Sequence, residues 1–237
     1  MIAGITPGSS ITSIALSGAS AQQLSNALHK DASDFHYSGL VSLGEAIAGI
    51  QKQRYSWATV KAYYASFYLA RAALAANGMA IFYVGSKPLS WVASAGSSPV
   101  KRKGNTHDLV LQIFDQSTFM PTLMNQVIGL TNAVDWLNDQ RTLANYKLTR
   151  FPDPSPTQCM TFIASSSLRA VTDAYIADQI GMYYLDQDHA ILAFPLELVK
   201  SLNKINRPAL EPDERKHLMD LYRDAKGPFP AALRLFS

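Results

Sequence analysis

The stretch from Arg54 to Gly78, RYSWATVKAYYASFYLARAALAANG, constrains the fold more than any other part of the chain. Its spacing predicts a helix over about 55–77 that ends at Gly78, because glycine readily adopts the left-handed conformation that closes many helices. Small residues repeat along one face of this helix and bulky apolar residues along a second face. Two buried faces place the helix in the middle of a helical bundle.

The third face of this helix carries a basic and aromatic stripe. Its members recur every three or four residues and are Lys61, Tyr64, Tyr68 and Arg71. Residues at that spacing lie on one side of a helix. We expect the stripe to face a ligand site, such as an RNA site, or a partner. The alternative is a set of interior tyrosines with satisfied hydroxyls beside cations that extend to solvent.

Further helices are expected around this one. Apolar residues at a period of 3.6 predict a long helix over 121–148, and the proline-rich segment RFPDPSP stops it. A third long helix is expected over 156–184. Shorter helices are expected at 20–29, 40–53, 195–205 and 211–225.

The predicted fold class is all-α. We expect a helical bundle over 1–155 and C-terminal helices over 156–237 packed on the same domain. Within the bundle, over 79–105, apolar residues begin to alternate with polar ones at a period near two. This pattern favours a short inserted β-hairpin or an irregular excursion.

Composition narrows the functional classes. The net charge of +3 permits an anionic partner without requiring one. The single cysteine, Cys159, cannot form an internal disulfide and is expected in the core. The first twenty residues lack the pattern of a signal peptide, and no apolar run approaches the roughly 18 residues of a membrane span. We therefore expect a cytoplasmic protein without a membrane partner.

Common catalytic motifs do not account for this chain. The five histidines are scattered, with none of the paired spacings of a zinc site. Glycine-rich phosphate loops and the serine nucleophile elbow are missing from the sequence. The sequence therefore predicts neither a metal nor a cofactor.

Two polar clusters remain as candidate sites. The loop KRKGNTH places three consecutive cations, Lys101, Arg102 and Lys103, shortly before Asn105 and His107. The expected helix over 121–148 contains a second cluster: Asp139, Arg141, Asn145 and Tyr146. An arginine fork beside an amide and a phenol can hold a phosphate. The alternative is that Arg141 pairs with a nearby aspartate and has no chemical role.

Three segments of the sequence resemble the HEPN superfamily of small α-helical proteins. The central helix matches the recurrent pattern YYxxFYxARxxLxxxG of that family, NTHDLVLQIF is similar to its H-x-x-[VL]-x-x-x-F segment, and RTLANYKL is similar to its RNxADY ending. The resemblance covers about residues 40–152. It implies a bundle that dimerises so that two polar motifs meet in one cleft.

Active HEPN proteins carry arginine and, four to six residues later, histidine, and they cut RNA without a metal. Here the aligned pair is Arg141 and Tyr146, while Arg102 and His107 form a literal match in the loop. One hypothesis is therefore a bacterial toxin–antitoxin or phage-defence endoribonuclease. In it Arg141 holds the phosphate, Asn145 and Tyr146 orient it, and the stripe of the central helix lines the same crevice. His107 is a secondary candidate that enters this crevice from a second direction.

In the same hypothesis the cations at 101–103 bind the phosphates of the RNA backbone. The second hypothesis is a catalytically silent module that binds a nucleotide, a nucleic acid or a partner protein. The partners that the resemblance implies are a second copy of the chain and a cognate antitoxin or defence-complex protein.

Overall fold

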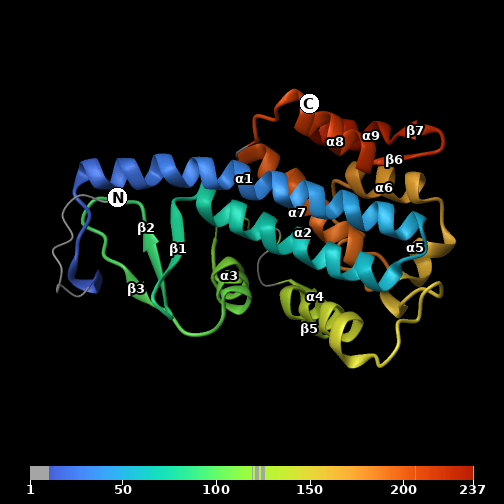
Figure 1. Cartoon of the computed structure of the whole chain (residues 1–237), viewed down its shortest axis with the longest axis horizontal. Helices are drawn as coiled ribbons and strands as arrows, with labels where there is room; N and C mark the ends of the chain where they lie inside the picture. Colours follow the sequence, from blue (N-terminus) through green and yellow to red (C-terminus); the bar gives the residue numbers. More distant parts are fainter. Residues whose placement is uncertain (1–10, 119, 121–122, 124–125, 206, 237) are drawn as a thin grey trace.

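Two long antiparallel helices form the spine of the molecule (Figure 1). The computed structural model describes residues 11–236 except 119, 121–122, 124–125 and 206. Helix α1 runs over Gly18–Gln51 and helix α2 over Tyr55–Ala76. The helix predicted at 55–77 is confirmed, and Gly78 follows it with a φ of 74°. A short 3-10 turn, η1 (Ile11–Ser13), precedes α1.

The prediction of separate helices at 20–29 and 40–53 is wrong, because α1 continues through the polar segment between them. That segment has no proline, and it still buries Ala32 and His36 on the inner side of the helix. The 34 residues of α1 extend about 50 Å at a rise of about 1.5 Å per residue. The N-terminal half of α1 therefore projects beyond the end of α2 (Figure 1).

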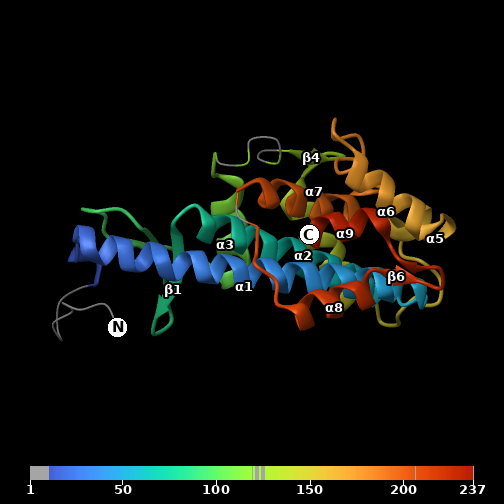
Figure 2. The same ribbon diagram turned by 90° about the horizontal axis from the view of Figure 1, so that it is seen from above.

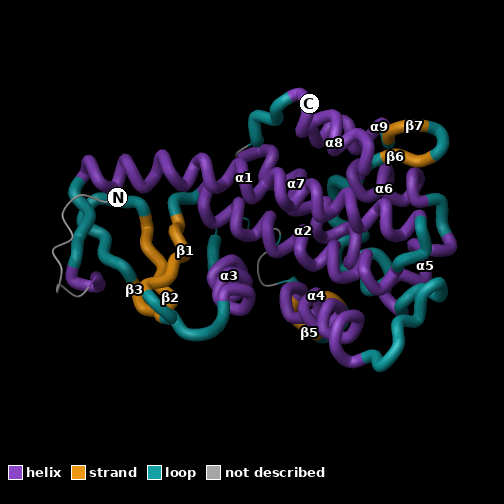
Figure 3. The backbone as a smooth tube through the Cα atoms, viewed as in Figure 1, coloured by secondary structure: helices purple, strands orange, loops and turns teal. Residues whose placement is uncertain are grey.

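An antiparallel sheet packs against this projecting half of α1 (Figures 1 and 3). Its strands are β1 (Met79–Val84), β2 (Lys87–Val92) and β3 (Val100–Lys101), in the order β1-β2-β3. The hairpin predicted within 79–105 is confirmed. Gly85 permits its tight turn with a φ of 60°.

The next segment differs from the prediction of one helix over 121–148. It contains α3 (Thr106–Asp115), β4 (Val127–Ile128), β5 (Thr131–Asn132), α4 (Ala133–Thr142) and a π-helical turn, η2 (Leu143–Lys147). Gly129, with a φ of 65°, turns the chain between β4 and β5, so the helix begins only at Ala133. Positions 121–122 and 124–125 of the predicted helix lie outside the described residues.

The C-terminal third is also more broken than predicted. Its elements are η3 (Gln158–Met160), α5 (Thr161–Ser165), α6 (Leu168–Ala177), α7 (Ala190–Ile205), α8 (Pro212–Leu221), β6 (Arg223–Asp224), β7 (Gly227–Pro228) and α9 (Pro230–Phe236). The prediction of one helix over 156–184 is wrong because a new helix begins after Ser167. The Ser167 side chain caps that helix by accepting the N–H of Ala170. The helix predicted at 195–205 begins earlier, and the one predicted at 211–225 ends in a short hairpin.

The C-terminal helices lie along the half of the α1–α2 pair that is remote from the sheet (Figure 2). Helix α7 packs against α2, and buried residues of α2, α3, α4 and α7 share one core. Gly44 allows the C-terminal segment to approach α1, since a Cβ there would lie 2.7 Å from Leu221 and Tyr222. The Tyr222 hydroxyl donates to the Leu40 carbonyl at 2.8 Å. The fold is mainly helical, with short antiparallel sheets.

Across the part of the chain that the structure describes, no helix is both long and apolar enough to pass through a lipid bilayer.

Candidate functional site

A pocket of about 500 Å³ lies between α2 and the facing ends of α3 and α4. We call it the central pocket. Its polar and aromatic walls come from three elements, and their main members are Tyr64, Tyr68 and Arg71 of α2, Asn105, His107 and Asp108 at the start of α3, and Asn138 and Arg141 of α4. The central pocket thus joins residues from all three segments that resemble the HEPN pattern.

Helical spacing explains why α2 contributes this wall. The two faces predicted to be buried are buried, from Ala58 to Ala72 on the small-residue face and from Val60 to Leu74 on the bulky face. The stripe between them is half-buried. Tyr64, Tyr68 and Arg71 follow one another at four and three residues, so all three reach the central pocket.

The loop before α3 places His107 at the mouth of the central pocket. The Asn105 side chain caps the helix by accepting the N–H of Asp108 at 3.1 Å, so the helix starts at Thr106 and His107 is in its first turn. The His107 ring stacks on Phe67 with 4.3 Å between ring centroids. Its Nδ1 lies 3.2 Å from the Tyr63 hydroxyl.

The surroundings of His107 favour the neutral imidazole. Burial lowers its pKa below the ordinary 6.5, and the positive charges of Arg141 and Arg71 lower it further, against an opposing effect of Asp108. The neighbouring Tyr63 is buried, and burial raises its pKa to about 12. The Tyr63 hydroxyl therefore stays protonated at neutral pH and holds one ring nitrogen of His107.

Arg141 is surrounded by aromatic rings. Its guanidinium carbon lies 5.2 Å from the centroid of Tyr63, 5.9 Å from that of Tyr64 and 5.4 Å from that of Tyr146. The Nε atom is buried and donates to no atom of the described residues. No carboxylate of the described chain forms an ion pair with Arg141. The expected alternative, pairing with a nearby aspartate, is therefore not what the structure shows.

Arg71 supplies a second cation to the central pocket. Its guanidinium carbon lies 3.9 Å above the ring of Phe35 on α1, which fixes the plane of the group. Burial lowers the pKa of Arg71, whereas the charge of Asp31 opposes that shift.

Arg71 from α2 and Arg141 from α4 form no ion pair with a described carboxylate. The carboxylate of Asp108 also lines the central pocket, and it accepts from the Asn105 side chain at 2.7 Å. Two arginines against one carboxylate leave the central pocket suited to an anion.

The other predicted site residues lie elsewhere. Lys61 forms an ion pair with Glu45 and is outside the central pocket. On the hairpin, Arg102 donates from Nε to the Ser90 hydroxyl at 2.8 Å. Lys101 ends strand β3 and Lys103 is exposed just after it. These three cations flank the segment that leads to His107 without lining the central pocket.

Asn145 and Tyr146 depart from the predicted arrangement for a local reason. Both lie in η2, where the π-helical pattern bonds residues five apart, so the four-residue spacing from Arg141 no longer defines one face. Asn145 is half-buried and does not line the central pocket. Tyr146 is 66% exposed, and its hydroxyl lies 3.5 Å from a terminal nitrogen of Arg141.

Several lining residues were not predicted, including Asp108 and Asn138. Asn138 precedes Arg141 by three residues on α4, so the helical spacing that is used for α2 would have found it. Asn105 belongs to the polar loop cluster, and it opens α3 with Asp108 three residues later, a common capping pattern. Phe67 was assigned only to packing, yet its ring supports His107.

Metal chemistry has no ligand set in the described part of the chain, where no three His, Cys, Asp or Glu side chains gather closely enough to hold an ion. Cys159 is buried near the Thr157 hydroxyl, and burial raises the pKa of its thiol. It therefore packs as a core residue, as expected.

Comparison of the chain with protein-family models, with curated proteins and with solved structures finds no match. The chemistry of the central pocket therefore carries the functional argument. It combines two guanidinium groups, a neutral imidazole, amide side chains, one carboxylate and half-buried tyrosine rings, and the guanidinium groups and rings can bind phosphate and stack a base.

Proposed function

We propose that the protein is a HEPN-like, RNA-directed effector of a bacterial toxin–antitoxin or phage-defence system, and that it cleaves RNA in the central pocket without a metal. The observation that carries this proposal is the meeting of His107, Arg71 and Arg141 in one pocket. A base and two cations beside a phosphate are what cleavage by the 2′-hydroxyl needs.

The residues have separate roles in this reaction. Arg71 and Arg141 bind the non-bridging oxygens of the scissile phosphate and stabilise the charge that develops on them. In the tautomer whose Nδ1–H donates to the Tyr63 oxygen, Nε2 of His107 is free to accept the proton of the 2′-hydroxyl. The resulting oxygen attacks phosphorus, the bond to the 5′-oxygen breaks, and that oxygen takes a proton from water.

Cleavage is tested by incubating the protein with total RNA and with tRNA in the presence of a chelator. We expect new fragments that end in a 2′,3′-cyclic phosphate. His107→Ala should lower the rate by about 10²–10³, the range for general acid–base groups. His29→Ala, an exposed histidine on α1, is the matched control. The nuclease proposal fails if no fragments appear, or if His107→Ala and Arg141→Ala cleave as fast as the parent.

One observation favours a second candidate, the catalytically silent binding module. His107 is the sole imidazole among the described residues that line the central pocket, so no second histidine there can protonate the leaving oxygen. A mobility-shift titration with RNA distinguishes the two candidates. Binding that Arg141→Ala weakens, without any cleavage by the parent, would assign the silent module.

The proposal includes a homodimer and a cognate antitoxin or defence-complex protein. The support is the exposed apolar surface beside the central pocket, where Tyr146 and Leu143 are 66% and 38% exposed. A second copy that covers η2 would bring two central pockets together. Sedimentation equilibrium tests this arrangement: Tyr146→Asp should shift the protein toward monomer, and a parent that is already monomeric would contradict it.

A further inference from the structure

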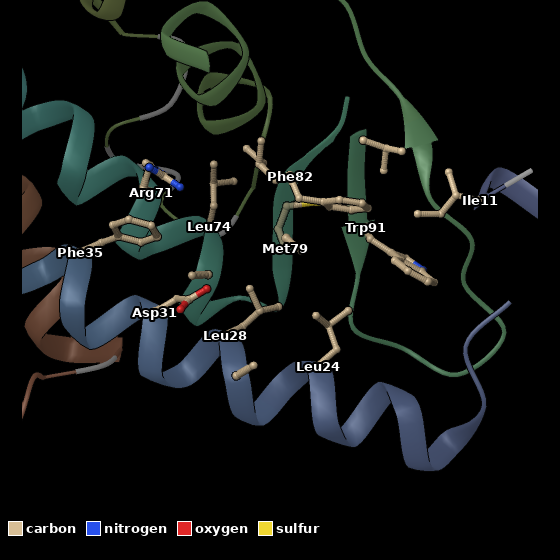
Figure 4. A pocket seen from close by; sticks show the side chains of 15 residues that line it. Ile11, Leu24, Leu28, Asp31, Phe35, Arg71, Leu74, Met79, Phe82 and Trp91 are labelled. Atoms are coloured by element: carbon tan, nitrogen blue, oxygen red, sulfur yellow. The ribbon is translucent and has the colours of Figure 1, made fainter. Parts of the chain in front are cut away.

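A second pocket lies at the sheet end of the molecule, between the projecting half of α1, the end of α2 and the inner face of β1 and β2 (Figure 4). We call it the apolar pocket. Its volume is about 420 Å³, within the range of about 300–1,000 Å³ for small-molecule sites. Most of its wall is hydrocarbon or aromatic and includes Leu24, Leu28, Leu74, Met79, Phe82 and Trp91.

Small side chains keep the apolar pocket open. Ala75 and Ala80 line it as buried residues, at positions where a leucine would fill much of the space. Around it, Leu28 and Trp91 are well buried and belong to the separate core cluster under α1. The wall presents apolar surface that is accessible from the solvent, and covering such surface is favourable. The space is therefore suited to an apolar guest.

Two opposite charges mark one end of the apolar pocket. Asp31 of α1 and Arg71 of α2 both contribute to the wall, near Phe35 (Figure 4). No ion pair within 4.0 Å joins them, nor does either make one with another described residue. A ligand bound at this end thus lies near one hydrogen-bond acceptor, the Asp31 carboxylate, and one set of donors, the Arg71 guanidinium.

We propose that the apolar pocket binds a small aliphatic molecule with an uncharged amide head. The hydrocarbon part would displace water from the leucine and methionine walls, while the amide carbonyl accepts from Arg71 and the amide N–H donates to Asp31. A carboxylate head would be repelled by Asp31, and an ammonium head by Arg71. An uncharged group with both a donor and an acceptor satisfies the two side chains together.

Arg71 also lines the central pocket. A bound amide that engages its guanidinium would weaken phosphate binding there, and by linkage phosphate would weaken amide binding. This consequence rests on the proposed function, whereas amide binding itself does not. Titration of the amide in the absence of RNA therefore fails or succeeds independently of cleavage.

The test is a calorimetric titration of the whole chain with n-octanamide, octanoate and octylamine. We expect saturable binding of octanamide at one site, with the two charged compounds weaker by about tenfold. Asp31→Asn should bring octanoate within a few fold of octanamide. Absence of saturable octanamide binding, or equal affinity for all three compounds in the parent, would overturn the proposal.

Matched tryptophan variants test the location. Ala27→Trp fills the apolar pocket and should weaken octanamide binding by about tenfold or more. Asn26→Trp places the same ring on the exposed side of α1 that faces away from the apolar pocket, and it should leave binding unchanged. Circular dichroism and thermal melting confirm that both variants fold. Equal loss in both variants overturns the location, and uridine or guanosine binding as tightly as octanamide overturns the aliphatic class.

Discussion

The central and apolar pockets share helix α2 and one residue, Arg71, yet they differ in chemistry. Beside the central pocket, α2 faces the capped start of α3 and the polar side of α4, which contribute His107 and Arg141. Beside the apolar pocket, α2 ends and the chain turns into a sheet under α1, so leucines and alanines form the wall. The partner elements, rather than α2 alone, determine what each stretch of this helix can bind.

Removing the Arg141 side chain should strongly affect the central pocket and leave the apolar pocket unaffected. Arg141→Ala should slow RNA cleavage by about 10²–10³, the range measured when one group that stabilises developing charge is removed. Octanamide affinity should stay unchanged, because Arg141 does not line the apolar pocket. Arg150→Ala, an exposed arginine after η2, is the control and should retain both activities. Loss of octanamide binding in Arg141→Ala would mean that the two pockets are not independent.

Substitution of Arg71, the residue that both pockets share, should lower ligand affinity in each pocket by a smaller factor. Arg71→Gln keeps a polar side chain but removes the charge that serves phosphate on one side and the amide head on the other. We expect affinity for RNA and for octanamide each to fall by about tenfold, the value of one charged hydrogen bond. Filter binding and calorimetry measure the two affinities.

Lys61→Gln is the matched control for Arg71→Gln. It removes a cation from the same helix, but that cation pairs with Glu45 and lines neither pocket. If Lys61→Gln lowered both affinities as much as Arg71→Gln does, general charge rather than the position of Arg71 would be responsible.

The sequence predicted the side of α2 that forms the central pocket, because residues at four and three positions apart on one helix must share a face. Three of the four stripe residues, Tyr64, Tyr68 and Arg71, therefore line the central pocket, whereas Lys61 pairs with Glu45 outside it. The family resemblance led to the further expectation that the stripe and Arg141 share one crevice and that His107 enters it from a second direction, and His107 and Arg141 both line the central pocket. How α3 and α4 dock against α2 is encoded by no local pattern, so the helical spacing alone did not predict it.

The wrong helix boundaries have local causes as well. Leu123, Val127 and Leu130 follow a helical period, yet Gly129 adopts a positive φ and Leu130 is fully exposed in the turn. The period was therefore coincidental over a segment that forms a hairpin. The apolar pocket could not be predicted either, because it depends on the projection of α1 past α2.

A titratable group distinguishes the central pocket from the apolar pocket: His107 lines the first, and no histidine of the described residues lines the second. The pKa of His107 lies below the ordinary value, so between that lowered value and pH 6.5 the unfolded chain binds more protons than the folded one. The contribution of His107 to stability is therefore present above pH 6.5 and is lost as the pH falls through its folded pKa. His107→Gln should flatten this part of the dependence of stability on pH, measured by urea unfolding.

The same shift can be observed directly by NMR titration of the histidine ring protons. Arg141→Ala and Arg71→Gln each remove a positive charge that lowers the pKa of His107, so each should raise it. Arg150→Ala should not. An unchanged pKa of His107 in both variants would show that burial alone lowers this pKa. The two arginines would then have no electrostatic effect on the proposed base.

The smallest effect on RNA binding is expected for the two lysines at the end of β3 and just after it. Lys101 and Lys103 are exposed and line neither pocket, so changing both to alanine should weaken RNA binding only a few fold. The loss should grow as salt is lowered, since exposed cations act on the backbone through a screened field, and each lost phosphate contact reduces the salt slope by about 0.7 for a single strand. Mobility shifts over a salt series measure the slope, with Lys216→Ala on α8 as the control. A double variant that binds as weakly as Arg141→Ala would place the main RNA contact on the hairpin, and the central pocket would then hold only the cleaved phosphate.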